Sequence, residues 1–402
     1  MMKDIEGGVC APAGFLASGV AAGIKKPGSP KLDCALVVSE RPAAVAGAFT
    51  KNLLKSPPTK WTEGVCIRGE ARAIFINSGN ANAVTGQQGA EDVQRIAECV
   101  SGPLNMPITQ VCVLSTGVIG QLLPMDRVEK GIAAAIPALQ VSGHENAAKA
   151  IMTTDLVMKE AALEVNMSDG PVRIGAMAKG SGMIRPDMAT MFCILTTDAH
   201  VDAGLLSTMV KSAVNKSFNC ICVDNDMSTS DAVVCLANGA SGVAIQEGSA
   251  DASIFQAALD KLCIHMAQWL VRDGEGATKF VEIEVSGAAS EEDAKAIARS
   301  IAQSMLCKTA FAGEDANWGR IACAAGYAGA PFQPERLSIS IGGLQVLYEG
   351  LPTGYAEADA AARMKEHDIR VEVKVGDGEG HARFWTSDLT HEYVSINADY
   401  RT

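Results

Sequence analysis

The chain has 402 residues, with 34 Lys and Arg against 46 Asp and Glu, and therefore a formal net charge of −12. This acidic balance argues against nucleic acid as the main partner, because phosphate binding depends on clustered basic residues. Hydrophobic residues make up 48% and charged residues 20% of the chain, which predicts a substantial core. No apolar run reaches the roughly 18 residues that a membrane span needs, and acidic residues precede the apolar stretch 9–24. We expect a cytoplasmic protein without membrane contact.

Predicted elements alternate between short β-rich runs and amphipathic helical windows from residue 30 to residue 235. The pattern predicts strands at 35–39, 73–77, 111–115, 172–176, 191–196 and 221–223. It predicts helices at 89–100, 125–135, 145–152 and 203–217, followed by a long helix at 252–270. This alternation is typical of a layered α/β fold.

The texture of the sequence changes near residue 275. Alternating strands are predicted at 279–285, 337–341, 371–375 and 382–385, with a helix at 291–305. We therefore expect two domains, an α/β domain at 1–275 and a smaller α+β domain at 276–402.

Cysteines and histidines give no sign of a metal site. The 12 cysteines include no C-x-x-C pair, and the six histidines include no H-x-x-x-H pair. Buried, reduced thiols are the expected state of these cysteines. Asp224-Asn225-Asp226 begins like a calcium loop, but Thr229 and Cys235 stand where the loop needs Gly and Glu. We expect no metal and no resident cofactor.

A Gly-rich segment, 177–188, leads through Pro186-Asp187 into an apolar run that is too short for a helix. Thr190 should therefore lie at the start of a buried strand, where a β-branched residue is ordinary and a structural role is the default interpretation. A different role arises if the Ala189–Thr190 bond can be cut. The new α-amine would have a pKa of about 7.7 to 8.0, so that part of it is neutral and can accept the hydroxyl proton. One residue would then supply both nucleophile and base, and the same hydroxyl could make the cut by attacking the Ala189 carbonyl.

Seven segments along the chain form a distinctive series: 14–25, Asn77-Ser78-Gly79-Asn80-Ala81-Asn82-Ala83, Ser115-Thr116-Gly117-Val118-Ile119-Gly120, Met152-Thr153-Thr154-Asp155, 179–190, Asn317-Trp318-Gly319-Arg320 and 396–402. Each segment is weak alone, but together and in this order they are highly specific. Through them the whole chain resembles the ornithine acetyltransferase / glutamate N-acetyltransferase family of arginine biosynthesis.

The resemblance implies an N-terminal-threonine-hydrolase-like α/β/β/α sandwich with a smaller C-terminal α+β domain. It implies self-cleavage between Ala189 and Thr190 into an α chain, 1–189, and a β chain, 190–402, with two of each in the assembly. It also implies ping-pong transfer of acetyl from N-acetylornithine to glutamate through acetyl-Thr190. Some members of the family accept acetyl-CoA as well, so acetyl-CoA is a further candidate co-substrate.

Site residues follow from the resemblance position by position. Thr190 matches the nucleophile, and Thr116 and Gly117 match the oxyanion-hole pair. Substrate contacts are implied for Thr153, Lys179, Thr190, Glu275, Asn397 and Thr402, and the last two imply a tail that folds back over the site. Taken alone, Lys179 would be a solvated loop lysine. The substrate contact assigned to Thr153 could instead belong to its neighbour Thr154.

Glu275 has a twin in Glu379, because Asp273-Gly274-Glu275-Gly276 is repeated as Asp377-Gly378-Glu379-Gly380. The residues after Glu275 match the family better, and we expect Glu379 in a hairpin turn. Two other functions stay open at this point. One is a self-processing amidase or aminopeptidase of the same fold, in which water resolves the acyl-enzyme, and the other is a noncatalytic binding protein.

Overall fold

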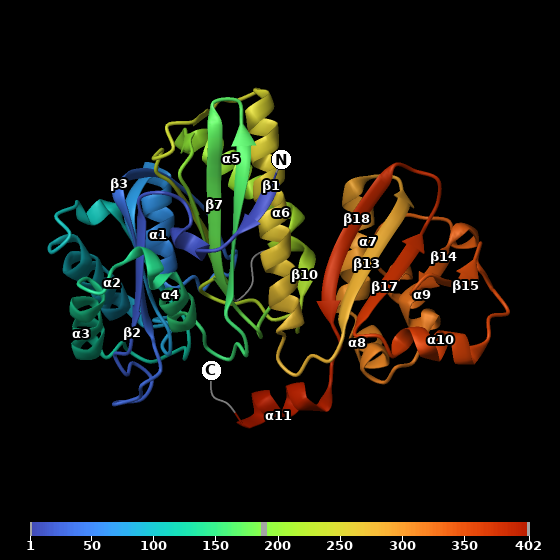
Figure 1. Cartoon of the computed structure of the whole chain (residues 1–402). Helices are drawn as coiled ribbons and strands as arrows, with labels where there is room; N and C mark the ends of the chain where they lie inside the picture. Colours follow the sequence, from blue (N-terminus) through green and yellow to red (C-terminus); the bar gives the residue numbers. More distant parts are fainter. Residues whose placement is uncertain (1, 186–190, 400–402) are drawn as a thin grey trace.

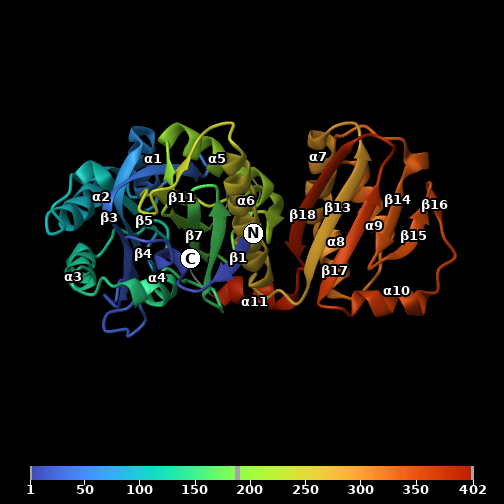
Figure 2. The same ribbon diagram turned by 45° about the horizontal axis from the view of Figure 1, so that its top comes forward.

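The computed structural model describes residues 2–185 and 191–399, and two main β-sheets with surrounding helices dominate this part of the chain. Figure 1 shows a larger domain, coloured blue to yellow, beside a smaller orange and red domain built from the end of the chain. Figure 2 shows the same two bodies side by side after a 45° turn. The expected layered α/β fold with a smaller C-terminal α+β domain is confirmed.

The larger sheet has nine strands within the described residues. Its main order is β1 (Met2–Ile5), β6 (Lys159–Met167), β7 (Gly170–Lys179), β8 (Phe192–Thr197), β11 (Ala232–Ala237), β3 (Cys34–Phe49), β4 (Glu70–Asn77) and β5 (Val111–Ser115), while β2 (Phe15–Val20) pairs with β3. The β8–β11 and β4–β5 pairs are parallel, and the other pairs are antiparallel. Strand β3 is long enough to serve both halves of the sheet, since its first part pairs with β2 and its second part with β11.

Helices cover both faces of this sheet because successive strand residues point to opposite sides. In β4, Ala73 and Phe75 pack into a cluster with α2 (Gly86–Ser101) and α3 (Met125–Ala135). Ile74 and Ile76 belong instead to a second cluster, together with side chains of α1 (Pro57–Arg68) and α4 (His144–Ala150). In β8, Cys193 and Leu195 join a third cluster with α5 (Ala203–Lys216) and α6 (Ala250–Arg272).

The second sheet has the order β10 (Ile221–Cys222), β18 (Gly380–Ser387), β13 (Phe280–Ala288), β17 (Asp368–Lys374), β14 (Ser338–Ile341), β15 (Leu344–Tyr348) and β16 (Leu351–Pro352). A two-stranded sheet pairs β9 (His200–Val201) with β12 (Ala244–Ile245). Helices α7 (Glu291–Gln303), α8 (Met305–Ala312), α9 (Trp318–Gly326) and α10 (Glu357–Met364) accompany the second sheet. The predicted strand at 221–223 therefore exists, but it pairs with the second sheet rather than the first.

The single helix predicted at 291–305 is wrong in one respect, because the structure divides this region into α7 and α8. The Ser304 hydroxyl accepts a hydrogen bond from the Cys307 backbone N–H, which makes it the N-cap of α8. Strands β6 and β11 were not among the predicted elements.

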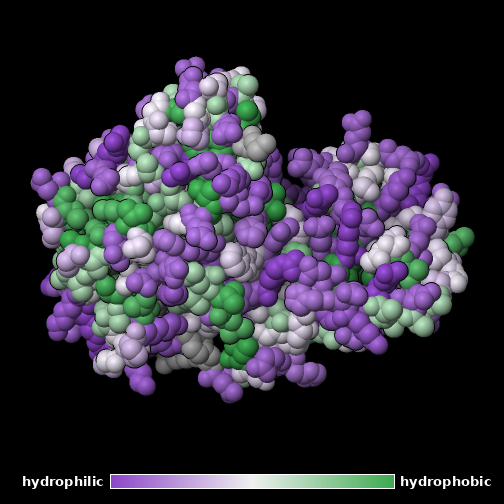
Figure 3. Space-filling view, in the orientation of Figure 1, coloured by the Kyte–Doolittle hydropathy of each residue, from purple (hydrophilic) through white to green (hydrophobic). Residues whose placement is uncertain are grey.

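The C-terminal helix α11 (His391–Asp399) leaves the second domain and runs back beneath the first, as Figure 1 shows. The expected return of the tail thus holds as far as Asp399, while Thr402 lies outside the described residues. All 12 cysteines are free and nine of them are buried, as predicted. In Figure 3 hydrophilic residues dominate the visible face of the second domain, and hydrophobic residues form small patches over the first. None of the helices in the described ranges is long and apolar enough to cross a membrane.

Candidate active site

One pocket of about 70 Å³ collects every predicted site residue that the structure describes. Its lining comprises Ala81, Thr116, Gly117, Ile119, Thr153, Thr154, Lys179, Gly182, Met183, Ser228, Thr229, Ser230, Glu275 and Asn397. Ala189, Thr190 and Thr402 lie outside the described residues. The described residues on either side of Ala189 and Thr190 are Arg185 and Met191, and strand β8 begins at Phe192.

Thr116 and Gly117 follow directly after β5, where the chain turns toward the pocket. The Thr116 backbone N–H donates to the Asn77 carbonyl at 3.0 Å, which leaves the Thr116 hydroxyl as the group that can serve the pocket. Gly117 has φ = 128°, and a Cβ there would meet the Gly79 carbonyl carbon at 2.4 Å. Glycine is therefore required at 117, because only glycine permits both this conformation and this close approach.

The Asn-rich loop after β4, residues 77–83, lies directly against Gly117. The Asn77 amide donates to the Asn80 carbonyl at 2.9 Å, and its oxygen accepts from the Ser115 hydroxyl at 2.6 Å. The Asn80 side chain donates to the carbonyls of Gln121 and Leu122. These buried amides satisfy the polar backbone of two loops, which explains the sequence pattern in this segment.

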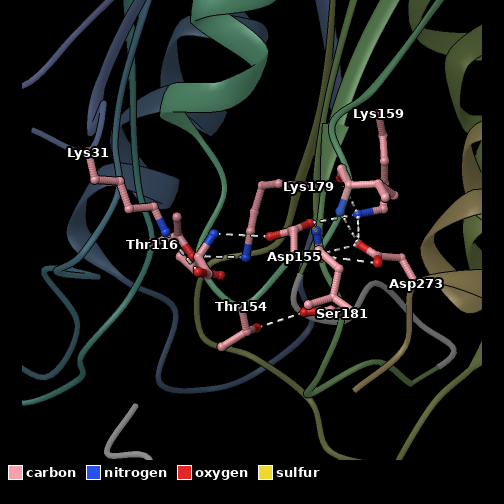
Figure 4. A network of polar contacts seen from close by, with 12 residues as sticks. Lys31, Thr116, Thr154, Asp155, Lys159, Lys179, Ser181 and Asp273 are labelled. Carbon is pink, nitrogen blue, oxygen red and sulfur yellow. Dashed lines mark hydrogen bonds and ion pairs between the residues drawn. The ribbon is translucent and has the colours of Figure 1, made fainter. Parts of the chain in front are cut away.

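Lys179 is the last residue of β7, and Figure 4 shows its ammonium group next to Thr116. The residue is only 2% exposed, and its Nζ lies 3.5 Å from the Thr116 hydroxyl oxygen. Burial, together with the charge of Lys159, lowers the pKa of Lys179, and the carboxylates of Asp155, Asp231 and Glu275 offset only part of this lowering. A solvated loop lysine is therefore the wrong interpretation: this cation is enclosed and can stabilise a negative charge inside the pocket.

Glu275 follows the end of α6 by three residues, and its backbone N–H donates to the Ser181 carbonyl at 2.8 Å. A Cβ on Gly182 would lie 2.4 Å from Glu275 Oε2, so the close contact depends on glycine at 182. The Asn397 amide of α11 donates to the same Oε2 at 2.9 Å. Glu379 lies elsewhere, in the loop from β17 to β18; these two strands flank β13 on either side, so the predicted hairpin at Glu379 is wrong.

Thr153 and Thr154 both line the pocket. The Thr154 hydroxyl is hydrogen-bonded to the Ser181 hydroxyl at 2.7 Å. The Thr153 backbone is held from outside the pocket lining: its N–H donates to Asp155 Oδ2 at 3.0 Å, and its carbonyl accepts from Lys31 Nζ at 3.0 Å.

Sequence reasoning missed the segment 228–231, which forms one wall of the pocket. Ser228, Thr229 and Ser230 line the cavity, and Asp231 Oδ1 accepts a hydrogen bond from the Met191 backbone N–H at 2.8 Å. Asp231 is fully buried, and this burial raises the pKa of its carboxyl. A Ser/Thr run directly before an apolar strand was the signal available in the sequence. No group of three or more His, Cys, Asp or Glu suited to a metal is found among the residues that the structure describes.

Comparison with known proteins gives consistent matches. A model of the ArgJ family matches residues 16–402. The arginine biosynthesis bifunctional protein ArgJ of Symbiobacterium thermophilum is 48% identical over 402 residues, covering 100% of both chains. ArgJ 1 of Nostoc sp. is 44% identical over 411 residues, covering 100% of this chain and 99% of the relative. A crystal structure of arginine biosynthesis bifunctional protein argJ from Bacillus halodurans is 42% identical, with a TM-score of 0.50, over 52% of this chain and 98% of that chain.

The family resemblance that the sequence motifs indicate is thus confirmed over nearly the whole chain. The chain belongs to the ArgJ family and is an acetyltransferase of arginine biosynthesis.

Proposed function

We propose that this enzyme transfers the acetyl group of N-acetylornithine to glutamate through an acetyl ester on Thr190, giving ornithine and N-acetylglutamate. One observation carries the proposal. Five segments that lie far apart in the sequence deliver Thr116 and Gly117, Thr153, Lys179, Glu275 and Asn397 to one pocket. Donors for an oxyanion, a buried cation and a carboxylate are the groups that acyl transfer between amino acids needs.

Self-cleavage supplies the nucleophile in this proposal. The Thr190 hydroxyl attacks the Ala189 carbonyl, the peptide nitrogen leaves as the new α-amine, and water hydrolyses the resulting ester. A cut at this bond leaves 189 and 213 residues, and 213 is about 53% of the 402. The solved Bacillus halodurans chain supports this division, because 52% of the present chain covers 98% of it.

Acetyl transfer then uses the new N-terminus of the β chain. Its α-amine, with a reference pKa of about 7.7 to 8.0, accepts the hydroxyl proton while the hydroxyl oxygen attacks the acetyl carbonyl carbon. The oxyanion that forms accepts hydrogen bonds from the Thr116 hydroxyl and the Gly117 N–H, a contribution of about 3 kcal/mol per donor. Ornithine leaves with the proton, and the amino group of glutamate reverses the sequence by attacking the acetyl ester.

Lys179 and Glu275 give the pocket its selectivity in this mechanism. The Lys179 ammonium suits a substrate carboxylate, and its position beside Thr116 adds positive charge next to the oxyanion. The Glu275 carboxylate suits the ammonium group of ornithine or a proton transfer. Acetyl-CoA as a second donor, an assembly of two α and two β chains, and a cytoplasmic location complete the proposal. The 12 unpaired cysteines support a reducing compartment.

Product analysis tests the proposal against a hydrolase of the same fold. The enzyme is incubated with N-acetylornithine, with and without glutamate, and we expect N-acetylglutamate to form in step with ornithine only when glutamate is present. Release of acetate without N-acetylglutamate would instead identify an amidase. The Thr190→Ala protein is the control, and it should give neither product.

A further inference from the structure

A buried lysine lies between two carboxylates directly behind the pocket wall. The Lys159 side chain is 0% exposed, and its Nζ lies 2.8 Å from Asp155 Oδ1 and 2.5 Å from Asp273 Oδ2. Figure 4 shows the three side chains pointing toward one another, with Lys179 on the far side of Asp155. None of the three lines the pocket.

Each carboxylate also holds the backbone of a segment that carries a site residue. Asp155 Oδ2 accepts from the Thr153 N–H at 3.0 Å, and Asp155 Oδ1 accepts from the Gly180 N–H at 2.6 Å. Gly180 directly follows Lys179, so one carboxylate fixes the backbone next to both Thr153 and the pocket cation. A displacement of Asp155 would therefore also displace Thr153 and Lys179, which both line the pocket.

Asp273 holds the segment that carries a third pocket residue, Glu275. Its carboxylate accepts from the Leu156 N–H at 3.1 Å and the Val157 N–H at 3.4 Å, in addition to Lys159. Two residues later the chain reaches Glu275, whose N–H is bound by the Ser181 carbonyl. The ion pair to Lys159 thus ties the segment that carries Glu275 to the segments that carry Thr153 and Lys179.

Burying three charges adds little net stability to a fold, because their desolvation offsets most of their attraction. The three side chains instead fix the local geometry, because moving any one of them leaves a buried charge without its partner. Catalysis and binding depend on geometry to within about 1 Å, which makes the wall of a pocket the place where this device is useful.

We propose that Asp155, Lys159 and Asp273 form a positioning triad that sets the separation of Lys179 and Glu275 across the pocket. The inference rests on the proposed function, because the Ala189–Thr190 cut leaves Asp155, Lys159 and Lys179 on the α chain and Asp273 and Glu275 on the β chain. The Lys159–Asp273 ion pair is then a bridge between the two chains that keeps the halves of the pocket in register.

The test is a charge-matched double variant, Lys159→Met with Asp273→Asn. It removes one positive and one negative charge, keeps the Asp155–Lys179 attraction, and leaves an amide oxygen to accept from Leu156. We expect normal cleavage, a KM for glutamate raised by about tenfold or more, and a smaller change in kcat. Lys308→Met is the matched control, because Lys308 is another buried lysine, bound to Thr386 and Ser387 and absent from the pocket lining. Its kinetic constants should stay at wild-type values.

A double variant with wild-type KM and kcat would overturn the triad, and so would an equal KM effect in Lys308→Met. If the double variant does not fold, Asp273→Glu keeps every charge and moves the carboxylate by one methylene group. A raised KM then supports the triad, and an unchanged KM overturns it.

Failure of the proposed function is separately visible, because wild-type enzyme would then make no N-acetylglutamate. In that case gel filtration in rising urea still tests the bridge. Fragments of the double variant should separate at lower urea than wild-type fragments, and equal midpoints would overturn the bridge.

Discussion

The side-chain amide of Asn397 donates a hydrogen bond to the carboxylate of Glu275 at 2.9 Å, although 122 residues separate them in the sequence. Asn397 belongs to α11, the final helix, while Glu275 lies just after the long helix α6 of the first domain. A C-terminal segment normally frays unless contacts hold it. This contact gives the tail a defined role, because it completes the environment of a pocket carboxylate.

Asn397→Ala should weaken the pocket without unfolding the protein. Asn397 is exposed, so little packing is lost, but Glu275 Oε2 loses a donor that orients it. We expect an increase in KM of about five- to tenfold, equivalent to a hydrogen bond of about 1 kcal/mol. Steady-state kinetics measure this, with Ser395→Ala on the same helix as control, since its hydroxyl donates to the His391 carbonyl of its own helix. Equal effects of both variants would show that the helix, rather than the amide, matters.

Gly182→Ala tests the close approach of Glu275. The new methyl group would stand 2.4 Å from Glu275 Oε2, and the carboxylate must move to admit it. We expect a fall in kcat/KM of about a hundredfold with little change in the melting temperature. Gly354→Ala is the control, because among the described residues no atom lies within 4 Å of the position that its Cβ would take. Wild-type activity of Gly182→Ala would mean that Glu275 is not confined in this way.

The sequence predicted the parts of this molecule whose pattern is local. The strand at 111–115 matches β5, the strand at 191–196 begins one residue before β8, and the helix at 252–270 lies inside α6. Hydrophobic periodicity sets these elements, and burial follows it directly.

Long-range features had no such local signal. Lys159 opens β6, and a lysine predicts an exposed position until its partner Asp273, 114 residues away, is known. Burial of Lys179 has the same origin, since it depends on where Asp155 and Asp231 lie. The family resemblance named Lys179 as a candidate, but only the structure shows that it is buried and that Asp155, Asp231 and Glu275 oppose the lowering of its pKa.

Thr116→Val separates the two oxyanion donors. Valine has the shape of threonine without the hydroxyl. The Thr116 backbone N–H already donates to the Asn77 carbonyl, so the substitution removes only the hydroxyl as a donor to the oxyanion. We expect kcat to fall by about a hundredfold while KM changes little, since the donor acts on charge that develops in the transition state. Thr62→Val is a control for the loss of a buried hydroxyl, because Thr62 bonds the Val113 backbone and neither residue lines the pocket. A change in KM alone in Thr116→Val would assign its hydroxyl to ground-state binding.

The lowered pKa of Asp155 predicts how the free energy of unfolding depends on pH. Burial alone would raise the pKa of Asp155, but Lys179, Lys159 and the Gly180 N–H outweigh it and lower the pKa to about 2. A depressed carboxyl pKa stabilises the fold above the unfolded value of 3.8, and this stabilisation is lost as the pH falls toward 2.

We therefore expect Asp155→Asn to reduce the free energy of unfolding by about 2 kcal/mol at pH 6, and by much less near pH 2. Urea titrations measure this in the Thr190→Ala background, which keeps the chain in one piece. A difference that stays constant from pH 6 to pH 2 would show that the charge of Asp155 is not responsible.

Intact-mass analysis of the purified enzyme tests the central claim, that cleavage makes Thr190 the N-terminal residue of the β chain and that Thr190 then accepts the acetyl group. We expect two fragments that meet at Ala189 and Thr190, about 20 kDa and 22 kDa by proportion of residues. With N-acetylornithine alone, the 190–402 fragment should gain the mass of one acetyl group at Thr190 and lose it when glutamate is added. An uncut chain that still transfers acetyl, or an acetyl group on any other residue, would contradict the account.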